Sequence, residues 1–310
     1  MELDSFKLRQ TRGVFDVLGD TFKYIRIYWK SLLIMTAVYV MGPLMIGSVI
    51  MAIGFGDIFA QPFLSPADIE ESAFFNSAGL LFGAFFFIGL SYVLLYGTIC
   101  QHLKHAAGGE VPLDISTFSE GMFFKVLVLV FVFILLTVLF SVIFFFLPTL
   151  LFTLISAQLG VFTIASVFLF SVLISIFLFI RLMVFPVALF VKDTGGLSSL
   201  GVSWNLTKGY FWQTFGVYLL ITIVFGILSQ LISTPLLLIN AIVSAGIGDA
   251  AGGFMDLISI IFFTLSFVFQ GLFFGAQSIS IGLHYFNLEE RKEGLTLGEQ
   301  VEQLAADTPS

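Results

Sequence analysis

Six long apolar runs dominate this sequence and limit what it can fold into. They lie near 31–53, 79–100, 126–146, 161–180, 214–236 and 257–281. An α-helix needs about 20 mostly apolar residues to cross the hydrocarbon core of a bilayer. The runs are continuous and lack the alternation of membrane strands. The sequence therefore predicts an all-α integral membrane protein with six transmembrane helices.

Composition supports this class. The chain of 310 residues is 58% hydrophobic and only 11% charged, with a mean hydropathy of +1.07. A soluble core of this size does not hide so much apolar surface. The third, fourth and sixth runs continue beyond one bilayer thickness, so we expect tilts or breaks near their ends. Pro148, Pro186 and Pro235 mark plausible positions for such breaks.

The distribution of the 13 Lys and Arg predicts the orientation. The connections after the first, third and fifth runs, 54–78, 147–160 and 237–256, contain no Lys or Arg. By the positive-inside rule, both termini then lie in the cytoplasm. The basic first thirty residues have no secretory signal pattern, so we expect the N-terminus to be kept. We expect a membrane domain over 1–288 and a cytoplasmic polar tail over 289–310.

A short aromatic motif recurs where three of the runs begin. KGYFWQTF at 208–215 resembles IYWKSL at 27–32 and MFFKVL at 122–127. Aligning 118–125 with 206–213 matches a glycine and a phenylalanine identically. This favours three repeated units, each an amphipathic interfacial segment followed by a helical hairpin. The alternative is that any span of this orientation begins with aromatic residues and Lys at headgroup level.

The segments before these runs, about 13–30, 112–125 and 195–212, are predicted to be amphipathic and interfacial. In the first, Leu18 and Phe22 begin an apolar stripe at helical spacing, beside a basic face. Such helices suit a membrane surface with anionic phosphates. The candidate lipid or interface contacts are Lys23, Arg26, Trp29, Lys30, Lys125, Trp204, Lys208 and Trp212. The alternative is that the segments only cap the bundle.

Four polar side chains fall at membrane depth, namely Arg181, Gln230, Gln270 and Gln277. We expect them to turn inward and bond to one another or to the backbone, because polar groups in hydrocarbon are costly. Arg181 has a second option, snorkelling to the headgroups. Two GxxxG pairs, Gly79/Gly83 and Gly271/Gly275, predict close helix approach. A polar transport pathway is the alternative interpretation of the glutamines.

Residues with catalytic or metal-binding chemistry are sparse. Cys100 is the only cysteine, and the histidines are His102, His105 and His284. We expect His102 and His105 to be a solvated interfacial pair rather than metal ligands, because no fourth ligand is evident. No GxSxG nucleophile motif occurs. We therefore expect no enzyme activity, no cofactor or metal, and no nucleic-acid partner.

At 181–220, RLMVFPVALFVKDTGGLSSLGVSWNLTKGYFWQTFGVYLL resembles a bacterial membrane domain named after glycerophosphoryl diester phosphodiesterases. The shared pattern is an Arg ending a span, then Pro, an acid at Asp193 with Gly, Ser-Trp, Leu-Thr-x-Gly and aromatic-Trp. FDVLGDTFKYIRIYWKSLL at 15–33 resembles the start of that domain. The resemblance implies the membrane part of a largely uncharacterised family, in the bacterial cytoplasmic (inner) membrane. The His-Arg pair of the catalytic barrel is absent from this chain.

Three functional classes follow from these observations. The first is a non-catalytic scaffold or accessory subunit that interacts with lipids or with a membrane-protein partner. The second, an alternative, is a transporter or channel for a small or lipidic solute. A lipid-modifying enzyme ranks last, since the catalytic residues are not found.

Overall fold

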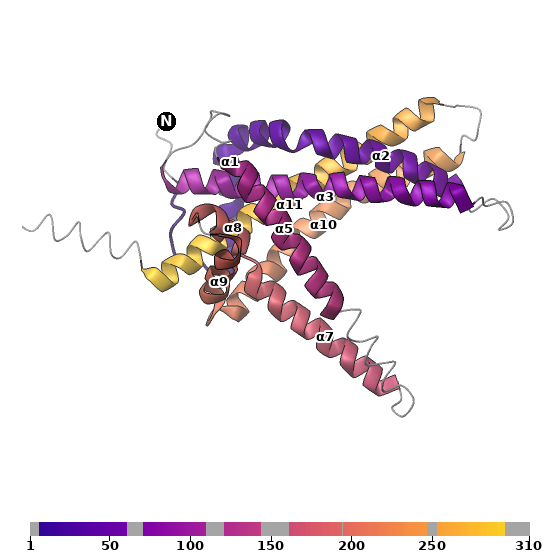
Figure 1. Ribbon diagram of the computed structural model, residues 1–310. Helices are drawn as coiled ribbons and strands as arrows, with labels where there is room; N and C mark the ends of the chain where they lie inside the picture. Colours follow the sequence, from indigo (N-terminus) through magenta and orange to yellow (C-terminus); the bar gives the residue numbers. More distant parts are fainter. Residues whose placement is uncertain are drawn as a thin grey trace, which may run out of the picture. The chain divides into compact units, whose positions relative to one another are not determined.

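The computed structural model describes residues 6–60, 71–109, 121–143, 161–193, 195–246 and 253–294, and their regular secondary structure is helical (Figure 1). The helices are α1 (Val14–Tyr39), α2 (Met41–Ala60), α3 (Glu71–Ala107), α5 (Met122–Ser141), α7 (Val161–Leu182), α8 (Phe185–Val191), α9 (Gly196–Thr207), α10 (Phe211–Gly246) and α11 (Gly253–Glu293).

Helix length and hydropathy confirm a multi-pass membrane protein. Within the described residues, five helical segments are long and apolar enough to cross a membrane: Ala78–Ala107, Met122–Ser141, Ser166–Val191, Phe211–Ile239 and Ile260–Glu293. A sixth span exists if α1 and the following Met41–Ile53 count as one, although they meet at a bend of 56°. The all-helical prediction is confirmed, and the predicted six spans correspond to five helical spans and one bent pair.

The bend in the first span was not predicted. α1 ends at Tyr39 and α2 begins at Met41, inside the apolar run predicted over 31–53. Pro43 has no N–H to donate to the carbonyl of Tyr39, and it lies in the first turn of α2, where a proline is tolerated. The chain therefore breaks here, whereas the predicted boundary between interfacial segment and span, at residue 30, lies within the continuous helix α1.

The three prolines singled out from the sequence have different outcomes. Pro186 lies in the first turn of α8, directly after α7 ends at Leu182, so the predicted break is confirmed. Pro235 lies inside α10, which continues to Gly246, so a helix end at this position is wrong. Pro148 falls outside the described residues.

The chain forms two compact units. Unit 1 comprises Met1–Asp20, Leu103–Leu220 and Ser280–Ser310, and unit 2 comprises Thr21–His102 and Ile221–Ile279. α11 continues past residue 288 to Glu293, and both Glu289 and Glu290 in its last turns are buried. The start of the predicted polar tail therefore belongs to a packed helix.

Within unit 2, α2 and α3 approach closely at a glycine. A Cβ on Gly47 would lie 2.9 Å from the backbone nitrogen of Ile88 and 3.1 Å from the carbonyl oxygen of Ala84. Ala84 and Ile88 form a buried cluster with Met51. Next to this contact, Ser48 Oγ lies 3.0 Å from Thr264 Oγ1 of α11. Small and hydroxylated residues thus join three helices.

The predicted GxxxG contacts are only partly present. Among the described residues, a Cβ on Gly79 or Gly83 would have no neighbour within 4 Å, so the expected close approach at this pair is wrong. Gly271 and Gly275 do face α3, and the hypothetical Cβ of Gly275 would lie 3.4 Å from Ile99 Cδ1. The spacing alone does not decide which helix face meets a neighbour.

Within unit 1, the short helices α8 and α9 pack beside α5 and α7 (Figure 1). Gly196, the first residue of α9, permits this approach, because a Cβ would lie 2.7 Å from Val128 Cγ1 of α5. The rings of Phe133 and Phe185 stack edge to face between α5 and α8, with centroids 5.7 Å apart. α9 is separate from α10, so the predicted segment 195–212 is a helix followed by a turn.

The aligned glycines of the predicted repeat have the same backbone conformation. Gly121 has φ of +72° before α5, and Gly209 has φ of +88° before α10. Glycine has no Cβ penalty in this left-handed region. The first copy differs, since Trp29 and Lys30 lie within α1 rather than at a helix start. The likeness is local, and threefold repetition of whole units stays a prediction.

Candidate functional site

Two lysines hold the acid at the end of α8. Asp193 Oδ2 accepts a hydrogen bond of 2.5 Å from Lys104 Nζ, and its other oxygen pairs with Lys125. Burial alone would raise the pKa of Asp193, but the hydrogen bonds from both lysines outweigh it and lower this pKa. Asp193 also has φ of +50°, a left-handed conformation that aspartate tolerates better than most residues. Asp193 thereby joins the C-terminal end of α3 and the N-terminal end of α5 to the loop before α9.

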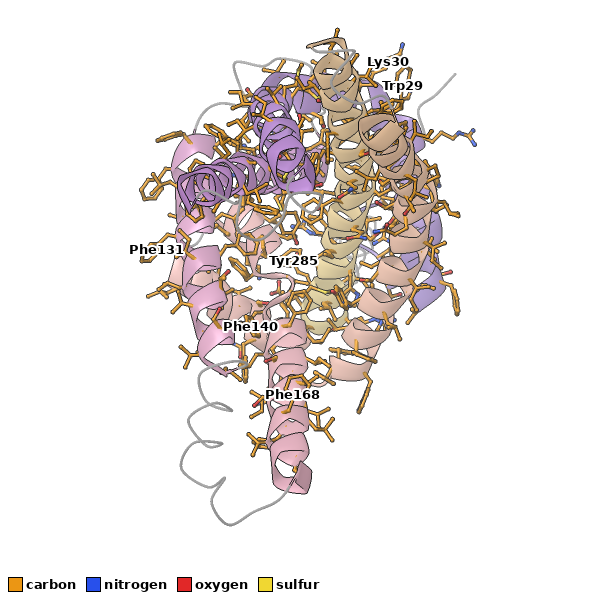
Figure 2. All side chains as sticks on the ribbon, turned by 90° about the vertical axis from the view of Figure 1, so that its right-hand side faces the viewer. Trp29, Lys30, Phe131, Phe140, Phe168 and Tyr285 are labelled. Carbon is orange, nitrogen blue, oxygen red and sulfur yellow. The ribbon has the colours of Figure 1, made fainter. Side chains whose placement is uncertain are left out.

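A buried carboxylate in α11 collects a second group of partners. Glu289, whose side chain is 3% exposed, lies 3.3 Å from Lys192 Nζ and 3.6 Å from Arg9 Nε. The hydroxyl of Tyr285 donates to it over 3.1 Å, and Figure 2 shows Tyr285 among the ribbons. Burial lowers the pKa of Lys192, but its contacts with Glu293 and Glu289 raise the net value above the ordinary one.

Arg12 ties the N-terminal segment to the last helix. Its side chain is 1% exposed and donates to Asp20 over 2.7 Å and to the carbonyls of Leu8 and Lys7 over 2.6 and 2.7 Å. Its own N–H donates to Asn287 Oδ1 over 2.8 Å. Burial lowers the pKa of Arg12, partly offset by Asp20, yet a guanidinium keeps its charge in proteins.

Apart from Lys7 near the N-terminus, four further cations of unit 1 make no ion pair to a carboxylate within 4.0 Å among the described residues. They are Arg181, Lys208, Arg291 and Lys292. Lys208 lies within residues 204–210, and the other three cations contact this stretch, which contains the end of α9 and the turn into α10. We call this set, together with Trp204, Tyr210 and Trp212, the α9–α10 cluster.

Arg181 approaches this stretch from the last turn of α7. Its guanidinium carbon lies 5.3 Å from the ring centre of Phe177 and 5.0 Å from that of Trp204, which is cation–π distance. Nη1 lies 3.5 Å from the carbonyl oxygen of Trp204. Ser203 Oγ donates to the carbonyl of Arg181 over 2.8 Å and fixes the backbone. Within the described chain, aromatic faces rather than carboxylates therefore hold this charge.

The other three cations lie on or beside the turn. Lys208 caps the C-terminus of α9, donating its backbone N–H to Asn205 over 3.3 Å, and its side chain is exposed. Lys292 Nζ of α11 donates to the same carbonyl of Asn205. The guanidinium of Arg291 lies 6.0 Å from the Tyr210 ring and donates to Asn287 over 3.0 Å. The backbone N–H of Lys208 and the side chain of Lys292 thus both donate to the carbonyl of Asn205.

Aromatic residues continue the cluster into α10. Trp212 is 77% exposed and meets Phe211 and Phe215 at centroid distances of 5.3 and 6.0 Å. Phe211 in turn packs against Phe177 at 5.4 Å. The rings at the start of α10 therefore connect the end of α7 to the exposed Trp212. Aromatic rings beside cations are typical of the membrane–water boundary.

The other predicted interface residues occupy two separate places. Lys23, Arg26, Trp29 and Lys30 are exposed on α1, and Lys30 Nζ lies 5.8 Å from the Trp29 ring. Figure 2 shows Trp29 and Lys30 projecting from the ribbon together. Lys125 is instead half-buried and bound to Asp193. The structure thus groups Trp204, Lys208 and Trp212 with Arg181, while Lys125 belongs to an ion pair.

The predicted intramembrane glutamines do not form a common site in the described residues. Gln230 is exposed on α10 and accepts a hydrogen bond of 3.2 Å from Thr234. Gln270 and Gln277 are half-buried on α11. No hydrogen bond among the described residues joins these amides to one another. The expectation that Gln230 turns inward is therefore not met.

The expected solvated histidine pair is wrong for His102. This residue is fully buried, and its Nδ1 lies 2.5 Å from the hydroxyl of Tyr24. Tyr28 packs edge to face against the same imidazole at 5.4 Å. Cys100 is also buried. Across the described part of the chain, no group of three His, Cys, Asp or Glu is arranged to hold a metal.

Sequence reasoning missed three members of the α9–α10 cluster, Tyr210, Arg291 and Lys292. Arg291 and Lys292 were assigned to the polar tail, although they directly follow the last long apolar run. A basic pair at the end of a span is a known signal of the membrane boundary. Comparisons of the chain with known protein families, curated proteins and solved structures found no match.

Proposed function

We propose that this chain is a non-catalytic membrane scaffold or accessory subunit that interacts with anionic lipids through its exposed aromatic and basic segments. One observation carries the proposal. In all three segments picked out by the recurring motif, an aromatic side chain is more than half exposed: Trp29 at 52%, Phe124 at 69% and Trp212 at 77%. Exposed rings next to lysines favour the headgroup region of a bilayer.

The local contacts support lipid contact better than a purely structural role. Trp29 and Lys30 contact each other on the surface of α1, and Trp212 contacts neighbouring aromatic rings at the start of α10 while most of its own ring stays exposed. Side chains this exposed contribute little to packing within the protein. Contact with a lipid surface would bury the aromatic rings and bring the lysine close to lipid phosphate, and both effects are favourable.

The test compares protein in nanodiscs of phosphatidylcholine alone with protein in phosphatidylcholine mixed with phosphatidylglycerol. A ligand that binds only the folded state stabilises it, by about 2.7 kcal/mol at a concentration of 100 Kd. We expect a higher apparent Tm in the anionic discs. Equal Tm values in the two lipids would contradict the proposal.

Matched variants locate the effect. Trp29→Ala with Lys30→Gln, and separately Trp212→Ala, should reduce the gain in Tm from anionic lipid. Phe131→Ala is the control, because Phe131 is similarly exposed but lies in the middle of α5 (Figure 2). Purified protein should also leave glycerophosphodiesters intact. Their hydrolysis, abolished by a point substitution in this chain, would favour the enzyme class instead.

A further inference from the structure

The charge of unit 1 is balanced in one region and unbalanced in another. Arg9, Arg12, Lys104, Lys125 and Lys192 each lie within 4.0 Å of a carboxylate. The four cations of the α9–α10 cluster do not, among the described residues. Gathering like charges without counter-charges costs free energy. The arrangement is stabilised if an anion from outside the described chain supplies the missing negative charge.

We infer that the α9–α10 cluster is a binding site for the phosphate of an anionic phospholipid. Lys208 and Lys292 are its direct ligands, because both side chains are exposed and Lys292 Nζ donates to the carbonyl of Asn205, three residues before Lys208. Arg181, held between Phe177 and Trp204, adds a positive charge on the side of α7. Arg291 is a positioning residue, since its guanidinium donates to Asn287 and to the carbonyl of Arg12.

The position of the cluster favours a lipid over a soluble anion. Arg181 lies in the last turn of α7, where the candidate span Ser166–Val191 is interrupted before α8, the candidate span of α10 begins at Phe211, and that of α11 ends at Glu293. Three apolar helices therefore reach their ends around the cluster. Phospholipid phosphates lie where membrane spans end, and basic pockets between spans are known to bind anionic headgroups. The exposed ring of Trp212 provides an apolar contact for the adjoining glycerol and acyl region.

The inference rests on the proposed lipid interaction and adds a defined headgroup site to it. Native mass spectrometry of the full chain counts bound phosphatidylglycerol, and titration gives its affinity. We expect one saturable site whose affinity falls at least tenfold in Lys208→Gln/Lys292→Gln. The Lys208→Arg/Lys292→Arg variant keeps both charges and should retain binding. Lys7→Gln removes an exposed lysine elsewhere in unit 1 and should leave the affinity unchanged.

The remaining outcomes distinguish a lipid site in the cluster from a lipid site elsewhere and from a soluble-anion site. If wild-type protein does not distinguish phosphatidylglycerol from phosphatidylcholine, both the site and the proposed function fail. If it does, but Lys208→Gln/Lys292→Gln binds as wild type does, only the cluster assignment fails. Saturation of wild type by inorganic phosphate or glycerol 3-phosphate, with loss of lipid binding, would identify a soluble-anion site and overturn the lipid assignment.

A control for folding keeps the test decisive. The glutamine variants must elute as wild type does in gel filtration and keep its apparent Tm in phosphatidylcholine. If the double variant does not, Arg181→Gln provides a second route, because its guanidinium contacts rings and one carbonyl rather than a described carboxylate. Arg181→Gln should weaken lipid binding severalfold, and unchanged affinity in that variant would overturn the inference.

Discussion

Arg12 Nε lies 2.7 Å from Asp20 Oδ2, across the start of α1, and the arginine is almost wholly buried. The carbonyl of Arg12 also accepts hydrogen bonds from Gln213, Asn287 and Arg291 at 2.9–3.2 Å. The residue therefore joins three elements through both its side chain and its backbone. Arg12 thus fixes the N-terminal segment against the start of α1, the start of α10 and the end of α11.

Replacing Arg12 by Met should destabilise the protein by about 3 kcal/mol or more, because Asp20 and three carbonyls lose a charged donor. Arg12→Lys should recover only part of this, since lysine cannot reproduce the planar fork. The apparent Tm in detergent measures both. Arg9→Gln is the control, because Arg9 is 40% exposed and its partner Glu289 keeps the contact with Lys192, so the loss of stability should be smaller. A larger loss for Arg9→Gln than for Arg12→Met would refute the assignment.

The ion pairs of Asp193 should stabilise the folded protein at a pH above the pKa of this carboxyl group and not at a pH below it. Its pKa is lowered in the folded state, so the contribution is present above the unfolded value of about 3.9 and disappears as pH falls through the folded value. Asp193→Asn keeps a residue that tolerates the left-handed backbone but removes this pH dependence. The side chain is 54% exposed, so each ion pair contributes less than about 1 kcal/mol.

Apparent Tm measured from pH 6 to pH 3 tests this assignment. Wild type should lose more stability over this range than Asp193→Asn. Lys104→Gln/Lys125→Gln should behave as Asp193→Asn does, because it removes the two partners of the carboxylate. Parallel curves for wild type and both variants would show that the ion pairs do not contribute.

Gly47→Ala should destabilise unit 2 by about 1–3 kcal/mol, because its methyl group would meet the backbone of α3 at Ile88 and Ala84. Backbone atoms cannot move aside as the end of a side chain does. Gly83→Ala is the matched control on α3, with open space around its Cβ, and alanine's helix propensity should make it neutral or stabilising. Thermal unfolding in detergent compares the two, and greater damage from Gly83→Ala would contradict the packing.

The positions of the helices were predictable because they depend on local composition. Runs of apolar residues indicate spans wherever they occur, and Pro186 indicates the start of α8. The bend at Pro43 was missed because this proline lies inside a continuous apolar run. Hydropathy does not reveal such a break, which depends on one missing N–H.

The contacts between helices were not predictable, because they depend on residues distant in sequence. The burial of His102 depends on Tyr24 in another helix, and the close approach of α2 and α3 occurs at Gly47 rather than at a GxxxG pair. For the candidate site, the KGYFWQTF motif contains Lys208 and Trp212. The grouping of this motif with Arg291 and Lys292 was not predictable, because it depends on the turn between α9 and α10 lying against the end of α11.

Thiol accessibility distinguishes the proposed scaffold from a transporter. In a Cys100→Ala background, Gln270→Cys and Gln277→Cys should stay unlabelled by an impermeant thiol reagent from either side of the membrane. The reason is that both side chains are half-buried on a spanning helix, and the structure joins neither to another glutamine among the described residues.

Lys208→Cys is the positive control, because this exposed position follows the end of α9. It should react from one side only, which also determines the orientation of the chain. Labelling of Gln270→Cys from both sides would reveal a hydrated path and make transport the better account of the fold.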